Sequence, residues 1–152
     1  MVDPIRSILL KHARDAFGNQ SRIDAQWQEL HFTAAPDFQG AVAEYETFRQ
    51  ILSENVDEIH FLPASSDTTL DSIYVHDPLL ITEKGAVLGN MGKAARRSEP
   101  DQVASYFSEI DVPVLGRMEG EARLEGGDVV WLDRNTLAVG LTYRTNMQAV
   151  HQ

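Results

Sequence analysis

The chain has 152 residues, a formal charge of −10 at pH 7 and no cysteine. Its length suits a single domain, residues 1–152, that buries about two thirds of its unfolded surface, and its 43% apolar and 24% charged residues are typical of globular proteins. The acidic balance argues against a nucleic-acid partner, and the missing cysteines exclude disulfides, thiolate zinc sites and a thiol nucleophile.

Membrane and secretion signals are weak. No apolar run approaches the roughly 20 residues that a membrane helix needs. The start "MVDPIRSILLKHARDAF" has a short apolar stretch without a small-residue cleavage site, so it is interpreted as the first structured element. A cytoplasmic location with no membrane partner is therefore expected. The negative charge is compatible with a cationic ligand, although solubility alone also explains it.

The first half of the chain predicts a strand, a connection, a helix and a second strand. Residues 5–10 form the first predicted strand, and polar residues 11–30 are expected to be irregular around Trp27. A helix is predicted after Pro36 and Asp37, which suit its first turn. Its apolar residues recur at helical spacing: Phe38, Ala41, Val42, Tyr45, Phe48 and Leu52. The segment "EIHFLP" then predicts a buried strand, followed by the polar loop "ASSDTTLDS".

The second half predicts short strands around one helix. The runs "SIYVHDP", "LLITEKG" and "AVLGNMG" are separated by turn signals and predict a local sheet. A helix is predicted over residues 99–109, with Ser98 as its cap, Pro100 in its first turn, and Val103, Phe107 and Ile110 as its buried stripe. A strand near Val114 and the pair "DVVWLD" and "TLAVGLTY" complete the pattern.

This element order predicts a mixed α/β fold with short strands. The two helices recur about 60 residues apart. The spacing is compatible with an internal repeat of a few strands and one helix, although no literal sequence repeat is present.

The segment "LDSIYVHDP", residues 70–78, carries two aspartates. As a strand, it would place Asp71 and Asp77 on one face together with Ile73 and Val75. A carboxylate in apolar surroundings needs a cation or a proton, so Asp77 is a candidate for binding one. Hydrogen bonds in a turn before Pro78 are the simpler alternative.

The segment "EGGD" and several arginines are further candidates. Gly126 and Gly127 permit backbone conformations and close approaches that a side chain would forbid, between Glu125 and Asp128. The arginine pair at 96–97 precedes a predicted helix, and Arg144 follows a predicted strand. Arginines in such places can bind a carboxylate in bidentate fashion. Taken singly, each is equally explained as a turn or a surface ion pair.

Metal and cofactor chemistry has little support in the sequence. The five histidines, His12, His31, His60, His76 and His151, show no ligand spacing such as i, i+4. There is no Gly-x-Ser-x-Gly elbow and no phosphate-binding loop. No metal and no cofactor are expected.

Four segments occur in an order that resembles a known superfamily: "LDSIYVHDP", "GNMGKAARRSEP", "LEGGDVVW" and "YRTN", after "APDFQGAVAEYETFRQIL". The chain is similar to the N-terminal half of guanidine-modifying enzymes, namely arginine deiminases, dimethylarginine dimethylaminohydrolases and glycine amidinotransferases. The resemblance implies an α/β pentein fold, or α/β-propeller, of which this chain would form about half of the five ββαβ repeats.

The resemblance also implies roles for individual residues. Asp77 matches the aspartate that holds the substrate guanidinium, and Glu125 matches the glutamate that supports the catalytic histidine and the guanidinium end. Asp71 matches a position near the substrate ammonium in the dimethylarginine hydrolases. Arg96 and Arg144 match arginines that bind the substrate α-carboxylate. Asp77 and Glu125 are thus the expected catalytic positions, and all five are expected to bind substrate.

The chain departs from the family in two respects. Family chemistry uses a cysteine thiolate and a histidine from the second half of the protein, and this chain has no cysteine and ends soon after the "RTN" segment. The histidine at position 151 comes too early to match the family histidine. His76 replaces the acidic or basic residue that some relatives carry beside the aspartate, and on the strand interpretation it faces away from Asp77.

Three hypotheses follow. The first is a truncated or split guanidine-modifying hydrolase, with amidino transfer as the second activity, inactive as this chain alone. The second is a non-catalytic protein that binds an arginine-like small molecule or regulates a partner, and that forms a homo-oligomer or associates with a chain supplying the second half. The third is a ribosome-binding pentein, against which the acidic balance argues.

Overall fold

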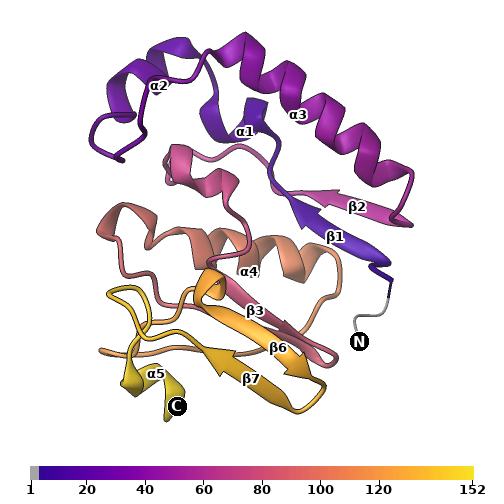
Figure 1. Cartoon of the computed structure of the whole chain (residues 1–152), viewed down its shortest axis with the longest axis vertical. Helices are drawn as coiled ribbons and strands as arrows, with labels where there is room; N and C mark the ends of the chain where they lie inside the picture. Colours follow the sequence, from indigo (N-terminus) through magenta and orange to yellow (C-terminus); the bar gives the residue numbers. More distant parts are fainter. Residues whose placement is uncertain (1–3) are drawn as a thin grey trace. The chain divides into compact units, whose positions relative to one another are not determined.

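The computed structural model describes residues 4–152, which divide into two compact units that meet between Tyr74 and Val75. Unit 1 lies before this point and unit 2 after it. Each unit has its own helices; unit 1 contains a two-stranded sheet, and unit 2 contains a three-stranded sheet and a separate pair of strands (Figure 1). The single domain over residues 1–152 that was expected from the length of the chain stays a prediction.

Unit 1 is built on a parallel pair of strands joined through a long helix. Strands β1 (Ser7–Leu10) and β2 (Glu58–Phe61) pair in parallel, and α3 (Phe38–Ser53) lies between them in the chain. Asp37 caps α3 by accepting a hydrogen bond from the backbone N–H of Gly40 at 2.6 Å. The two strands and the helix predicted from the first half of the sequence are confirmed, but β2 is not the buried strand expected, because its residues are exposed or only half-buried.

The connection between β1 and α3 is helical, so the prediction of irregular structure over residues 11–30 is wrong. It contains α1 (Ala13–Phe17) and α2 (Gln20–Gln26). His12 and Asn19 cap these helices through their side chains, which accept hydrogen bonds from the backbone N–H groups of Arg14 and Arg22. Both helices are too short to show a clear apolar period. The capping residues were therefore the only local signal for them, and the sequence interpretation missed it.

The core of unit 1 forms where these short helices pack on η1 and α3. Its buried residues are Ala13, Ala16, Phe17, Ile23, Leu30 and Leu70. Half-buried side chains of α3, including Tyr45, pack against this core. The ring of Tyr45 also lies 4.8 Å from that of the buried His12, measured between centroids. Burial raises the pKa of Tyr45 to about 12.

The segment "LDSIYVHDP" is not a strand, and the predicted alternation of its side chains is wrong. Residues Leu70–Ile73 form a short 3₁₀ helix, η1, which ends at Tyr74. The hydroxyl of Ser72 donates to the carbonyl of Thr69 at 2.7 Å, and the N–H of Tyr74 donates to the carbonyl of Asp71 at 3.0 Å. Such local hydrogen bonds compete with strand pairing, so the chain turns here.

Unit 2 begins with one complete ββαβ arrangement. Strands β3 (Leu79–Thr82) and β4 (Gly85–Leu88) pair antiparallel, and β4 pairs in parallel with β5 (Val114–Arg117). Between β4 and β5 lie the 3₁₀ helix η2 (Ala94–Arg96) and helix α4 (Glu99–Glu109). The predicted bounds of α4 are confirmed, with Pro100 in its first turn and Val103 and Phe107 buried.

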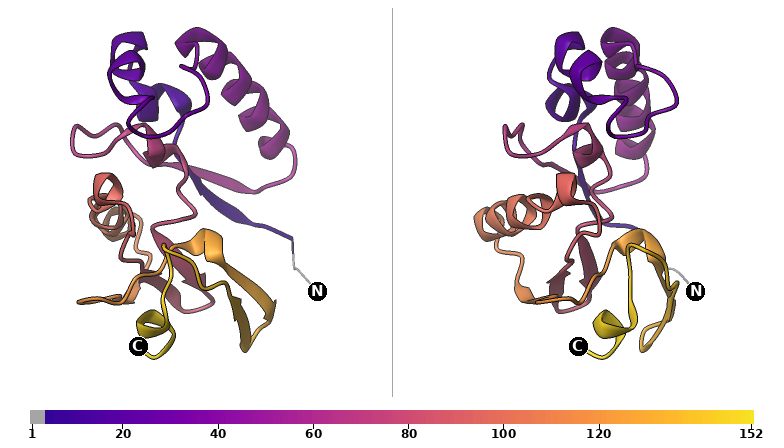
Figure 2. Two further views of the ribbon diagram at one scale, coloured as in Figure 1. Left: turned by 60° about the vertical axis from the view of Figure 1, so that its left-hand side comes forward. Right: turned by 90° about the vertical axis from the view of Figure 1, so that its left-hand side faces the viewer.

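A hairpin and a short helix follow. Strands β6 (Val129–Asp133) and β7 (Thr136–Val139) pair antiparallel after the 3₁₀ helix η3 (Gly126–Asp128), and α5 (Met147–Val150) ends the unit. Figure 2 shows the hairpin and α4 as separate layers of unit 2. The indole N–H of Trp131 in β6 donates to the carbonyl of Ile81 in β3, which ties the hairpin to the sheet.

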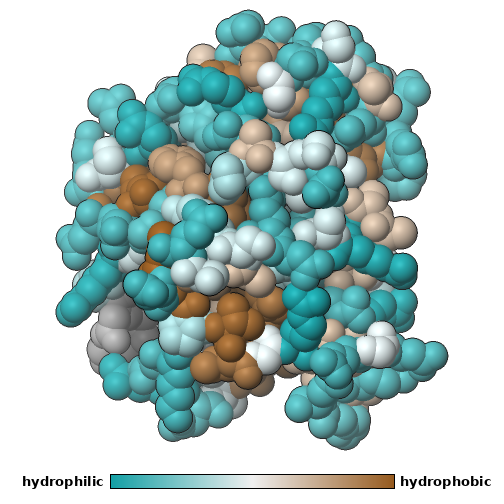
Figure 3. All heavy atoms as spheres, turned by 180° about the vertical axis from the view of Figure 1, so that it is seen from behind, coloured by the Kyte–Doolittle hydropathy of each residue, from teal (hydrophilic) through white to brown (hydrophobic). Residues whose placement is uncertain are grey.

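Both units therefore contain a parallel strand pair connected through a helix, which agrees with the predicted repeat of strands and one helix. The face drawn in Figure 3 is largely hydrophilic but is interrupted by apolar groups. Exposed apolar side chains in unit 2 include three consecutive residues of β6, Val130, Trp131 and Leu132. No helix among residues 4–152 has the length and apolar character required to cross a bilayer.

Candidate functional site

Four of the five predicted site residues meet in unit 2. Asp77 lies just before β3, Arg96 ends η2, Glu125 precedes η3, and Arg144 lies in the loop before α5. Ion pairs link these four side chains into one network. Asp71, the fifth residue, is buried within η1 of unit 1.

Arg96 is the most enclosed cation of this network. Only 4% of the residue is exposed. Its Nε and Nη2 donate to the two carboxylate oxygens of Glu99 at 2.9 and 2.7 Å, and its Nη1 donates to Oδ2 of Asp77 at 2.6 Å. Burial by itself would lower the pKa of Arg96, but the hydrogen bonds and charges of Glu99 and Asp77 outweigh it and raise the pKa. Arg96 therefore stays charged and cross-links two segments.

Glu99 is a site residue that the sequence interpretation missed. It is the first residue of α4, and its side chain is buried. The available signal was the Arg-x-x-Glu spacing, since residues three apart face each other on a helical turn. The sequence interpretation used Glu99 only as the first residue of a predicted helix.

Asp77 is held by the backbone of η3 as well as by Arg96. Its Oδ1 accepts a hydrogen bond from the N–H of Gly127 at 3.2 Å, and its carbonyl accepts one from Gly126 at 2.8 Å. A Cβ atom on Gly126 would lie 2.1 Å from the carbonyl oxygen of His76, so only glycine allows this approach. Asp77 thus makes both the cation pair and the turn hydrogen bonds that its sequence context suggested.

Glu125 is almost completely enclosed, with 1% of the residue exposed. Its Oε1 accepts a hydrogen bond from the N–H of Gly92 at 2.9 Å, and its Oε2 lies 3.3 Å from Nη1 of Arg144. Burial raises the pKa of Glu125, and the neighbouring charge of Asp77 adds to this, although the Gly92 N–H and the two arginines oppose it. The carboxylate is therefore poorly compensated and favours a proton or a further cation.

Arg144 bridges three carboxylates. Its Nη2 donates to Oδ1 of Asp128 at 3.0 Å, while its Nη1 lies 3.3 Å from Glu125 and 3.9 Å from Asp77. Burial would lower the pKa of Arg144, but these three carboxylates raise it. Its side chain is 30% exposed, which makes it the most accessible of the four linked residues.

Asp128 completes the network and had no assigned role in the sequence interpretation. Its Oδ2 accepts hydrogen bonds from the hydroxyls of Thr142 and Thr145, both at 2.8 Å. Burial would raise the pKa of Asp128, but these bonds and Arg144 lower it. The hydroxyl of Thr145 also accepts from the backbone N–H of Glu125, so the "RTN" and "EGGD" segments are fastened together.

The cluster carries more negative than positive charge. Its members, hereafter the acidic cluster, are the carboxylates Asp77, Glu99, Glu125 and Asp128 and the guanidinium groups of Arg96 and Arg144. With every group ionised, the formal charge is −2. Such an arrangement suits an additional cation with several hydrogen-bond donors. Across residues 4–152, no three His, Cys, Asp or Glu side chains are grouped so as to hold a metal ion.

The profile of one protein family matches residues 66–152, which is more than half of the chain and includes every residue of the acidic cluster. That family is arginine deiminase. The chain belongs to the arginine deiminase family. The guanidine-modifying superfamily inferred from the sequence motifs is thereby confirmed.

Among proteins similar in sequence, a dimethylarginine dimethylaminohydrolase from Pseudomonas aeruginosa is 25% identical over 117 residues, which cover 77% of this chain and 45% of that protein. An arginine deiminase from Listeria monocytogenes is 29% identical over 113 residues, or 70% of this chain and 27% of that protein. The chain thus spans less than half the length of these relatives.

Solved structures show the same fold. The citrulline complex of a Pseudomonas aeruginosa dimethylarginine dimethylaminohydrolase variant superimposes with a TM-score of 0.78 at 22% identity and covers 98% of this chain and 55% of that one. An arginine dihydrolase from cyanobacteria gives a TM-score of 0.65 at 19% identity, covering 97% of this chain and 19% of that one. The predicted pentein-type mixed α/β fold is confirmed over about half of the dimethylaminohydrolase chain.

Proposed function

We propose that the acidic cluster binds the guanidinium group of an arginine-like small molecule through Asp77 and Glu125. Both residues stand at the positions to which the superfamily resemblance assigns this role. The formal charge of −2 and the raised pKa of Glu125 support a site in which one cation is missing. A guanidinium fits such a site because it is planar and presents five donors.

The observation that carries this proposal is the position of Arg144. Its Nη1 lies 3.3 Å from a carboxylate oxygen of Glu125 and 3.9 Å from one of Asp77. A guanidinium group thus already lies between the two carboxylates, and it belongs to the protein. The geometry supports the view that the same two side chains accept a guanidinium from a ligand.

Ligand binding in this proposal is an exchange. The ligand's guanidinium takes the place of the Arg144 group between Asp77 and Glu125, and Arg144 turns to pair with the ligand's α-carboxylate. Its partial exposure makes it the cation that can move. Arg96 keeps its two carboxylate partners and orients Asp77, so its expected role as a second ligand for the α-carboxylate would require breaking buried ion pairs. Asp71 belongs to unit 1, and its expected role near the ligand's ammonium group stays a prediction.

The parent activity is proposed to be hydrolysis of a guanidine through a covalent cysteine intermediate, as the resemblance implies. The relatives described above are named as a deiminase, a dimethylaminohydrolase and a dihydrolase, which favours hydrolysis over amidino transfer. This chain contains no cysteine, so it supplies binding and orientation but not the nucleophile. Turnover then requires a thiol contributed by another polypeptide segment.

A non-catalytic role is the second candidate, and the missing thiol favours it. In that role the chain would sense an arginine-like cation or regulate a partner. The exposed apolar side chains of β6 support association with another polypeptide, which would be either a second copy or a chain supplying the rest of the fold.

The test compares arginine with agmatine, which has the same guanidinium but no carboxylate. Calorimetric titration should show that Asp77→Asn weakens the affinity for both ligands by at least tenfold, because the guanidinium of each ligand loses a charged acceptor. Arg144→Gln should raise the affinity for agmatine, since the guanidinium of the protein no longer competes with that of the ligand. The same variant should lower the affinity for arginine relative to agmatine. Arg134→Gln, at an exposed arginine paired with Glu83 on the hairpin, is the matched control.

Two results would contradict the proposal. If Asp77→Asn leaves both affinities unchanged while the variant is folded, the cluster is not the guanidinium site. If the purified chain steadily converts arginine or dimethylarginine to product, the assignment of the nucleophile to another polypeptide segment is wrong.

A further inference from the structure

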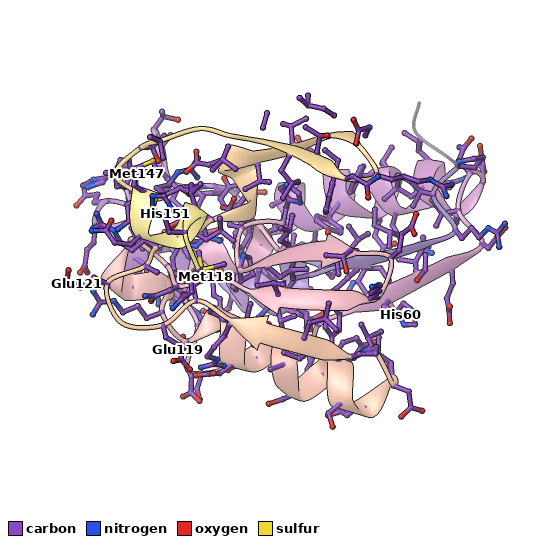
Figure 4. All side chains as sticks on the ribbon, turned by 90° about the horizontal axis from the view of Figure 1, so that it is seen from below. His60, Met118, Glu119, Glu121, Met147 and His151 are labelled. Atoms are coloured by element: carbon purple, nitrogen blue, oxygen red, sulfur yellow. The ribbon has the colours of Figure 1, made fainter. Side chains whose placement is uncertain are left out.

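A second site candidate in unit 2 is a hollow of about 620 Å³ that lies apart from the carboxylates of the acidic cluster. It is lined by Asn90, Met91, Arg97, Gly120, Glu121, Arg123, Asn146 and Gln148. Met91 is buried and the two arginines are exposed, so the lining is mainly polar and carries charged groups at the surface. Figure 4 shows the loop that carries Glu121 on the side of the molecule where α5 presents Met147 and His151.

Two asparagine side chains hold the walls of this hollow in place. The amide of Asn90 donates to the carbonyls of Gly120 and Ala122, at 3.2 and 2.7 Å. The amide of Asn146 donates to the carbonyl of Glu121 at 2.8 Å, and its oxygen accepts from the N–H of Arg123 at 3.1 Å. The loop between β5 and η3 is therefore pinned at four points, and the backbone that carries Arg123 is fixed.

The arginines of the hollow differ from the others of unit 2. Arg96, Arg117, Arg134 and Arg144 each have a carboxylate partner. Arg97 and Arg123 have none within ion-pair distance among the residues that the structure describes, and both line the same hollow. Glu121 is the only carboxylate in that lining, so the lining has a formal charge of +1 in a chain of −10.

The hollow and the acidic cluster are built from the same segments. Arg97 follows the buried Arg96, and Met91 precedes Gly92, whose N–H binds Glu125. Asn146 lies two residues after Arg144. In each case one residue belongs to the cluster and a residue one or two positions away lines the hollow. The packing of the cluster therefore also positions the backbone of Arg97, while Asn146 holds that of Arg123.

We infer that this hollow binds a small organic or inorganic dianion, with the guanidinium groups of Arg97 and Arg123 as its charged ligands and the amide of Gln148 as a further donor. Guanidinium groups meet carboxylate and phosphate oxygens with paired hydrogen bonds. Both a dicarboxylate and a phosphate present this chemistry. Glu121 on the rim disfavours ligands that carry more negative charge than the two arginines can offset.

The test uses succinate and inorganic phosphate as probes of the whole chain at low ionic strength. Two-dimensional ¹⁵N NMR follows the side-chain amides of Asn90, Asn146 and Gln148, which line the hollow. A saturable shift of these amides is expected with at least one probe. Preference for succinate indicates that the guanidinium groups bind separate carboxylates, and preference for phosphate indicates that they converge on one group.

Charge-removing variants decide whether the arginines are responsible. Arg97→Gln and Arg123→Gln should each lower the affinity for the bound probe by about tenfold. Arg134→Gln removes the same charge elsewhere in unit 2 and should leave the affinity within about twofold. The absence of saturable shifts up to millimolar probe, or an equal weakening by all three variants, would overturn the inference. All three side chains are exposed, so the amide spectrum of each free variant should match the wild type and show that it is folded.

Discussion

Replacement of Arg96 by methionine tests how the acidic cluster stabilises unit 2. The substitution keeps a long apolar stem but removes the guanidinium group, and with it the hydrogen bonds to Glu99 and Asp77. Both carboxylates would remain in place without their strongest cation. The side chain of Glu99 is 3% exposed, so water cannot replace the lost guanidinium.

The expected loss is large. Breaking a buried ion pair by removing one partner typically costs about 3–5 kcal/mol, because the other charge stays desolvated. Asp77 keeps the hydrogen bond from Gly127 and the neighbouring Arg144. Most of the penalty therefore falls on Glu99, and we expect a reduction of about 3 kcal/mol or more in the free energy of unfolding at pH 7.

Urea unfolding monitored by tryptophan fluorescence measures this loss. Trp131 lies in β6 of unit 2 and Trp27 lies in unit 1, so a Trp27→Phe background isolates the signal of unit 2. Arg97→Met is the matched control, because it changes the next residue, which is exposed and has no carboxylate partner in the part of the chain that the structure describes. That variant should change the free energy of unfolding by less than about 0.5 kcal/mol.

The double variant Arg96→Met/Glu99→Leu provides a second check. Removing both members of a buried pair avoids the isolated charge, so this protein should recover part of the lost stability. Equal stabilities of the Arg96→Met and Arg97→Met proteins would refute the reasoning. So would a double variant that is less stable than Arg96→Met alone, since Glu99 would then stabilise the fold without Arg96.

Two further perturbations probe the same network. Gly126→Ala places a Cβ atom 2.1 Å from the carbonyl oxygen of His76 and should lower the free energy of unfolding by about 1–3 kcal/mol. Gly116→Ala is the control, because its Cβ atom would meet no atom within 4 Å, and it should change the free energy of unfolding little in the same urea titration. For Glu125 the raised pKa makes protonation favour the folded state, so its contribution to stability is complete below the ordinary pKa and declines as the pH rises through the raised one. Glu125→Gln should remove that decline. The measurement is the free energy of unfolding of wild type and variant from pH 4 to pH 8, and a difference between the two that stays constant over this range would contradict the prediction.

Local sequence signals were sufficient for the two longest helices. Pro36 with Asp37 and Pro100 marked the starts of α3 and α4, and the apolar spacing after them gave helices that the structure confirms. These signals act within a few residues, so they survive without knowledge of the fold. The same reasoning failed at residues 70–78, where Ser72 and Thr69 form a turn that outcompetes strand pairing.

The membership of the acidic cluster was partly predictable. Asp77, Arg96, Glu125 and Arg144 were expected from ordered motifs, and the structure joins their side chains in one network. Their pairing was not predictable. The sequence suggested arginines facing a ligand, whereas Arg96 is enclosed by two carboxylates of the protein. Hydrogen bonds across 19 positions depend on how η2 packs beside the start of β3, which no local pattern encodes.

The amino-acid sequence by itself determined helices α3 and α4 and most strands of this protein, the absence of a thiol, and the excess of acidic groups, because each follows from neighbouring residues or from composition. Only the tertiary structure decided which charges neutralise one another: Arg144 lies among Asp77, Glu125 and Asp128, whereas Arg97 and Arg123 pair with no carboxylate of residues 4–152. Charge pairing weakens with distance and is screened beyond roughly 10 Å between exposed groups in salt solution. It is therefore set by the packing of distant segments and not by their order in the chain.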